Sequence, residues 1–154
     1  MSSLNLSDFY YGSVLSMLIN KGLNPILIEN SDERRIYRID INEGSFIIFL
    51  KYRKINKTKK KDYMSWNFNF TKEDIEKINE FKKDKNFKIA LILVSDDIKN
   101  SELAILDVEN IEELMKMNKT NFTITRKKRE RAFRIILNRD RAHSLMIPTS
   151  RSLI

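Results

Sequence analysis

Two short apolar runs, residues 46–50 and 89–94, place the strongest limit on how this chain can fold. The longer run has six residues, whereas an apolar helix needs about 20 to span a bilayer. Short continuous runs of this kind are typical of strands buried on both faces. We therefore predict a sheet covered by helices on at least one face, with residues 87–94 at its centre.

Periodic patterns outside these runs predict the remaining elements. Apolar residues at i, i+3, i+4 and i+7 from Tyr11 to Leu18 indicate a first helix, with an N-cap at Ser7 or Asp8 and a stop at Gly22. We expect further helices over residues 71–83 and 110–117, and strands over residues 26–29, 35–41, 45–53, 66–70, 87–94, 103–106, 122–125, 133–137 and 145–147.

This order predicts a single domain over residues 1–154 of the α/β class, with α+β as the alternative. A mixed central sheet with flanking helices would form a core over about residues 7–117. A basic β-hairpin and a last strand would follow over about residues 121–154.

Composition excludes several kinds of functional site. The chain has no cysteine, so disulfides, thiolate metal sites and a cysteine nucleophile are ruled out. His143 is the single histidine, and we interpret it as structural rather than as a metal ligand. No basic segment followed by an apolar stretch opens the chain. We expect a soluble, cytoplasmic protein that needs no cofactor.

Positive charge is concentrated in two segments. The formal charge is +8, from 29 Lys or Arg and 21 Asp or Glu. Residues 51–61 hold seven cations and no acid, and residues 121–154 hold nine cations and two acids, so each has a net charge of +7. Together they hold +14, which leaves −6 for the rest of the chain.

Clustered cations indicate a polyanionic partner, DNA or RNA, because each cation set against a phosphate releases a counterion. The alternative is a solvated loop and hairpin in a lysine-rich chain, and an acidic protein is another partner that would fit. The candidate nucleic-acid contacts are Lys51, Arg53, Lys54, Lys57, Lys59, Lys60 and Lys61 in the loop, and Arg126, Lys127, Lys128, Arg129, Arg131 and Arg134 in the hairpin.

Aromatic residues beside the basic loop have two interpretations. Trp66, Phe68 and Phe70 alternate along one side of a predicted strand, which favours burial in the core over a surface on which bases stack. Tyr52 and Tyr63 bracket the lysine run and are the better stacking candidates.

Asp40 lies near the end of the second predicted strand, and Lys51 lies near the end of the third. Together they give an acid on one strand and a lysine on the next. With the order helix, three strands, helix, strand, this pattern resembles the restriction-endonuclease-like superfamily, the PD-(D/E)-x-K nucleases. The family pattern also has a carboxylate two residues before the lysine, where this chain has Phe49. Segments around Lys51, Trp66 and Thr125 are also similar to a group of short bacterial proteins of unassigned activity.

The resemblance implies a nuclease-like core in which Asp40 would bind a metal and Lys51 would face the attacked phosphate. The alternative is that Asp40 flanks a turn and Lys51 begins a solvated lysine run. Because the motif is incomplete, we expect nucleic-acid binding without catalysis. Two other functions remain open: a Mg²⁺-dependent endonuclease with a displaced carboxylate (Glu29, Asp32, Glu33 or Glu43), and a protein-interaction subunit of a phage-defence or regulatory assembly.

Overall fold

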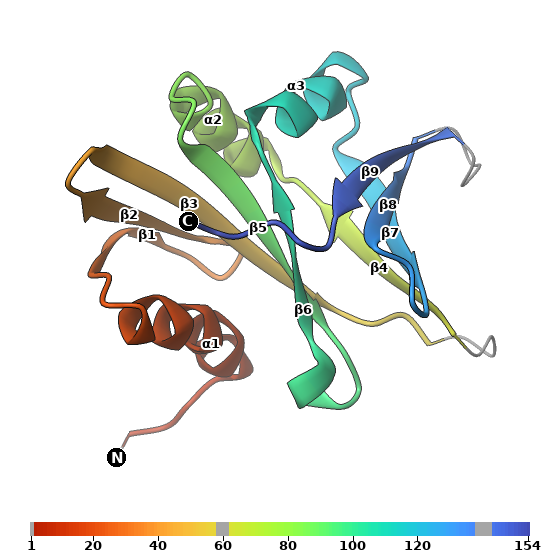
Figure 1. Cartoon of the computed structure of the whole chain (residues 1–154), viewed down its shortest axis with the longest axis horizontal. Helices are drawn as coiled ribbons and strands as arrows, with labels where there is room; N and C mark the ends of the chain where they lie inside the picture. The colour runs from red at the N-terminus through yellow and green to blue at the C-terminus, as the bar shows by residue number, and fades with distance from the viewer. Residues whose placement is uncertain (1, 58–61, 138–142) are drawn as a thin grey trace.

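Two β-sheets share one hydrophobic core in the computed structural model of this chain, which describes residues 2–57, 62–137 and 143–154 (Figure 1). Over these residues a mixed sheet has the strand order β1-β2-β3-β5-β6, and an antiparallel sheet has the order β4-β7-β8-β9. The elements are α1 (Leu6–Asn20), β1 (Pro25–Asn30), β2 (Arg35–Ile41), β3 (Gly44–Lys54), β4 (Tyr63–Asn69), α2 (Lys72–Phe81), β5 (Phe87–Val94), η1 (Ile98–Asn100), β6 (Glu102–Leu106), α3 (Val108–Lys116), β7 (Asn121–Lys127), β8 (Ala132–Ile136) and β9 (Ser144–Pro148).

The mixed sheet combines an antiparallel meander with a parallel crossover. Strands β1, β2 and β3 run antiparallel in sequence order, and β3 then pairs parallel with β5. Strand β6 runs antiparallel to β5. Residues 87–94 form the predicted strand, with a neighbour on each side, but the central position predicted for them belongs to β3.

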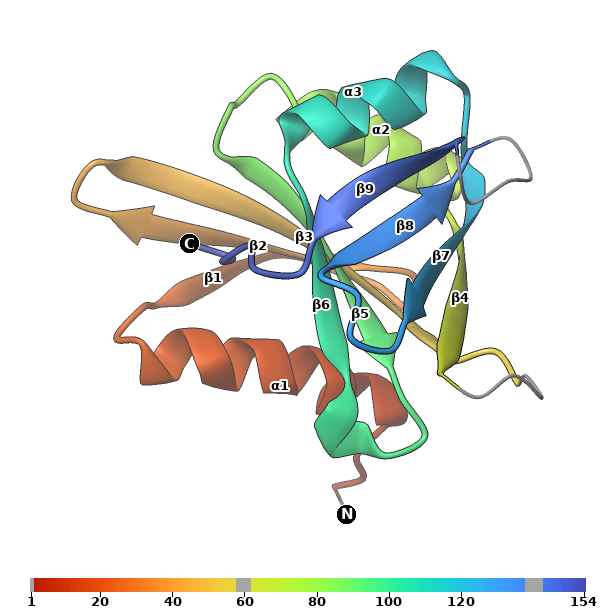
Figure 2. The same ribbon diagram turned by 45° about the vertical axis from the view of Figure 1, so that its right-hand side comes forward.

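Each face of the mixed sheet carries its own apolar cluster. Tyr11, Val14 and Leu18 of α1 pack on one face against β2, β3 and β5. The other face contacts the antiparallel sheet, α2 and α3, as Figure 2 shows. Among the described residues, no helix has the length and apolarity needed to cross a membrane.

The aromatic strand β4 belongs to the core, as its alternation favoured. Trp66, Phe68 and Phe70 are 1%, 2% and 3% exposed, and the Trp66 indole N–H donates to the Val94 carbonyl at 3.1 Å. Their burial removes them as a base-stacking surface.

The predicted mixed central sheet with flanking helices is present, but β4 lies outside it. Instead β4 pairs with β7, with Trp66 opposite Ile124, and the C-terminal hairpin and β9 complete a second sheet. Alternation identifies a strand and its buried face, but the partner strand lies more than 50 residues further along the chain. The hairpin is therefore part of the core rather than an addition to it.

All three α-helices of the described residues start with a capping box. The N-cap of α1 is Asn5 rather than Ser7 or Asp8, and Asp8 instead accepts a hydrogen bond from the Asn5 N–H at 2.9 Å. At α2, the Thr71 hydroxyl accepts from the Asp74 N–H at 3.0 Å, and the Asp74 carboxylate accepts from the Thr71 N–H at 2.8 Å. Such reciprocal bonds satisfy backbone donors that the helix itself leaves unpaired.

Candidate nucleic-acid interface

Lys51 is fully buried, so it is neither a phosphate-facing cation nor the start of a solvated run. Its ammonium group donates to the Asp74 carboxylate at 2.8 Å and to the Glu33 carbonyl at 2.9 Å. The Glu33 carboxylate lies 3.3 Å away. Lys51 and Asp74 are both 0% exposed. This ammonium group therefore ties β3 to the start of α2 and to the turn before β2.

Arg34 is the second cation of this buried cluster, and its guanidinium also contacts Asp74. Burial by itself raises the pKa of the Asp74 carboxyl, but hydrogen bonds from Lys51, Arg34 and the Thr71 backbone outweigh it and hold that pKa below its usual value. Asp74 is therefore a carboxylate at neutral pH, compensated by two buried cations.

The cluster does not fit a divalent metal ion as it stands. One Asp74 oxygen accepts from Arg34, and the other accepts from Lys51 and from the Thr71 backbone. A Mg²⁺ ion, which binds carboxylate oxygens directly, would have to displace these partners. Among the described residues, no group of three or more acidic, histidine or cysteine side chains is placed to hold a metal.

Asp40 lies far from this cluster. It pairs with Ser45 across the β2–β3 ladder, whereas Leu50, next to Lys51, pairs with Arg35 at the other end of β2. At about 3.3 Å per residue, six residues separate Asp40 and Lys51 by about 20 Å. The Asp40 carboxylate is exposed and forms an ion pair with Arg38 at 3.2 Å. The structure does not bring the two predicted catalytic residues together.

The hairpin turn of the second basic segment meets the residues that flank the first, on both sides of positions 58–61, at one corner of the antiparallel sheet. Tyr63 pairs with Lys127 at the end of the β4–β7 ladder, and the Lys128 N–H donates to the Asp62 carbonyl at 2.8 Å. On the other side of β4, the Asn56 N–H donates to the Ser65 carbonyl at 2.9 Å, which brings the neighbouring Lys57 to the same end. We call this surface the basic corner: Lys57, Asp62, Tyr63, Lys127, Lys128 and Arg129.

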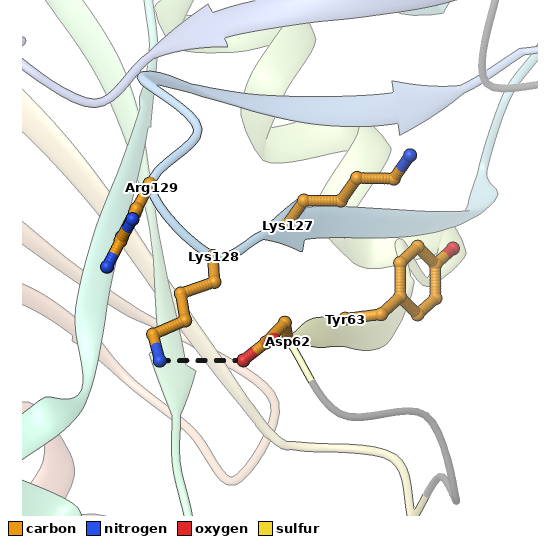
Figure 3. Close-up of a pocket in the computed structure, with 5 residues that line it drawn as sticks. All are labelled: Asp62, Tyr63, Lys127, Lys128 and Arg129. Atoms are coloured by element: carbon orange, nitrogen blue, oxygen red, sulfur yellow. Dashed lines mark ion pairs between the residues drawn. The ribbon is translucent and has the colours of Figure 1, made fainter.

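Exposed cations dominate the basic corner. Lys57, Lys127, Lys128 and Arg129 are exposed and Asp62 is their acidic neighbour, so these residues have a net charge of +3. Figure 3 shows Lys127 and Tyr63 extending to one side of the hairpin, while Lys128 reaches Asp62 in an exposed ion pair of 3.7 Å. Arg129 occupies the tip in a left-handed conformation, with φ 68°.

Two arginines of the hairpin are held by acids within the molecule. Arg126 forms an ion pair with Glu102 of β6 and lies over the Phe133 ring at 5.4 Å. Arg134 bonds to the Glu130 carboxylate at 2.9 Å. Glu130 also accepts from the Lys127 N–H at 3.1 Å, so it organises the turn. Arg131, in contrast, is exposed just after the turn.

The remaining candidates differ in their placement. Tyr52 packs against the rings of Tyr10 and Tyr11, with centroids 4.8 and 5.3 Å away, which makes it part of the α1 contact rather than a stacking surface. Arg53 is half-buried, and Lys54 is exposed at the end of β3. Lys59, Lys60 and Lys61 lie outside the described residues.

Sequence reasoning missed Asp74 as the partner of Lys51. The signals were present: a lysine directly after an apolar strand, and a capping-box acid in Thr71-x-x-Asp74. The chain has no match among protein-family models, curated proteins or solved structures.

Proposed function

We propose that this protein binds nucleic acid through the basic corner, without catalysis. The observation that carries the proposal is the contact between Lys128 and Asp62, which places the hairpin turn beside the residue that directly follows the first basic segment, although the two residues are more than 60 positions apart in sequence. Four exposed cations beside one exposed acid form a surface that attracts phosphates.

The order of elements supports a nuclease-like core for this binder. Helix α1, the meander β1–β3, helix α2 and the parallel strand β5 follow the order that the resemblance implies, with β4 inserted between β3 and α2. At the lysine position of the motif, however, Lys51 is engaged by Asp74 and Glu33, and the carboxylates around it do not fit a metal ion. We therefore assign the core a structural role and the basic corner the binding role.

A salt titration tests the proposal. Binding of fluorescent oligonucleotides, both single strands and duplexes, is measured by anisotropy between 50 and 200 mM salt. Each phosphate contact contributes about −0.7 to the log–log slope on single strands and about −0.9 on duplex DNA. Four contacts give a slope of about −3 or −4. No binding at 50 mM salt, or a slope shallower than −1, would contradict the proposal.

A matched pair of triple variants localises the surface. Lys127→Ala, Lys128→Ala and Arg129→Ala together should weaken binding about tenfold or more and flatten the slope by about 2. Lys83→Ala, Lys85→Ala and Lys116→Ala together remove the same charge from exposed positions near α2 and α3 and should change binding little. Equal effects of the two variants would show that net charge alone, not the basic corner, accounts for binding.

The same preparation separates the two other functions. Incubation of the protein and Mg²⁺ with plasmid and with single-stranded DNA should leave both DNAs intact. Cleavage of either would contradict binding without catalysis and favour the endonuclease function. Recovery of one cellular protein that survives nuclease treatment, together with no oligonucleotide binding, would favour the protein-interaction function.

A further inference from the structure

The solvent-facing side of β4 and β7 carries amides rather than apolar side chains. Side chains alternate along a strand, so Tyr63, Ser65, Asn67 and Asn69 share the face opposite the buried Trp66 and Phe68. Across the ladder, Thr123 lies opposite Asn67 and Asn121 lies opposite Asn69. The exposed amides Asn67 and Asn69 lie about 13 and 20 Å from Tyr63 along β4, at about 3.3 Å per residue. Between them and Tyr63 lies the pair of Ser65 and Thr125, of which Thr125 is buried.

A groove runs over the far end of this face. Arg53 of β3 lines it together with Asn67, Asn69, Asn121 and Thr123. The Thr123 hydroxyl donates to the Asn67 carbonyl oxygen at 2.9 Å, which turns the amide nitrogen of Asn67 away from that bond. Arg53 bonds to the Tyr52 carbonyl at 2.9 Å, which fixes its guanidinium at the groove. The groove thus presents donors and acceptors together with one cation.

Amide side chains on a sheet match the edges of unpaired bases. A carboxamide offers a donor and an acceptor side by side, as a base edge does. In a duplex, these edges are reachable only through a groove, and the major groove is about 12 Å wide. From β4 to β9 the sheet measures about 15 Å, at about 4.8 Å per strand, so its face is too broad to enter.

We infer that the outer face of β4 and β7 binds an extended single strand of nucleic acid, an inference that rests on the proposed function. Phosphates lie at the basic corner and at Arg53. One base stacks on Tyr63, and the following bases bond to Asn67, Asn69 and Asn121. Cations give affinity and salt dependence, whereas the tyrosine ring and the amides give the preference for unpaired bases.

The test compares a 12-nucleotide single strand with the 12-base-pair duplex of the same sequence at one salt concentration. We expect the single strand to bind about tenfold more tightly. The pair Asn69→Ala and Asn121→Ala should weaken single-strand binding about tenfold while leaving the salt slope unchanged, because no phosphate contact is lost. Tyr63→Leu should act in the same way, and Tyr63→Phe, which keeps the ring, should restore binding.

Controls keep the two proposals apart. Asn20→Ala and Asn79→Ala remove two exposed amides from α1 and α2 and should leave binding unchanged, and circular dichroism verifies the fold of every variant. Duplex binding as tight as single-strand binding, or amide variants with no effect, would overturn this inference while leaving the proposed function intact. Failure to bind either oligonucleotide would remove both.

Discussion

Replacing Asp74 with asparagine should cost this protein a large part of its stability. The carboxylate is 0% exposed and accepts hydrogen bonds from Lys51, Arg34 and the Thr71 backbone. Asparagine keeps the shape but offers one acceptor instead of two and points an N–H₂ group at a cation. Removing one partner of a buried ion pair typically costs about 3–5 kcal/mol, because the remaining charge stays buried.

That loss is large beside the 5–15 kcal/mol that typically separates folded from unfolded states. For a chain of this size, about 2–4 °C are lost per kcal/mol, so the melting temperature should fall by about 6–20 °C. Urea unfolding at pH 7, followed by circular dichroism, measures the free energy, and an unchanged m-value shows that the folded and unfolded states are still comparable.

Glu73→Gln is the matched control. Glu73 precedes Asp74 on the same turn of α2 and also pairs with Arg34, at 3.5 Å, but its side chain is 79% exposed. Exposed ion pairs contribute about 0–1 kcal/mol. If Asp74→Asn costs no more than Glu73→Gln, the reasoning about the buried cluster is wrong.

Three further outcomes are expected. Below pH 3.8 the difference in unfolding free energy between the wild-type protein and Asp74→Asn should shrink. The folded-state pKa of Asp74 is lowered, so the stability that its carboxylate contributes is lost as pH falls through the folded-state pKa. Urea titrations at several pH values measure this difference. Arg129→Gly should raise stability by up to about 1 kcal/mol, because glycine relieves the strain of the left-handed backbone at the hairpin tip. The same change should weaken oligonucleotide binding, so the melting temperature should rise while the affinity measured by anisotropy falls. Phe68→Ala should cost about 3–5 kcal/mol in urea unfolding, and Phe9→Ala, at a position 58% exposed, much less; similar losses would place the core elsewhere.

The sequence predicts the elements of this fold better than their pairing. The strand over Arg35–Ile41 and the strand over Phe87–Val94 have the predicted bounds, because their alternation and apolar runs are local signals. The division into two sheets requires β4 to pair with β7 across 51 intervening residues, and no local sequence pattern identifies that partner.

The site divides in the same way. Clustered charge identifies the basic corner, and the turn residues Lys127–Arg129 are exposed there. Charge alone cannot distinguish these exposed cations from Lys51, Arg126 and Arg134, which form ion pairs within the molecule. The acids paired with Lys51 and Arg126 lie more than 20 residues away in sequence, and the acid paired with Arg134 lies in the hairpin turn. A lysine immediately after a fully apolar run is a local sign of a buried cation, because the strand continues through it and keeps it in the interior.

The division of the core between the sheets has a consequence for how the chain could be cut. Trp66 and Phe68 of β4 pair with Ile124 and Phe122 of β7 in one sheet, and all four side chains belong to the apolar cluster that also contains residues of β3 and β5. A chain ending after α3 would leave β4 without its partner strand and the cluster without the apolar side chains of β7, β8 and β9. The remaining C-terminal piece would be a sheet with a bare apolar side. Neither fragment would be expected to persist alone, but the two expressed together are suited to reassemble, which makes the Lys116–Asn121 connection a natural place for a split-protein reporter.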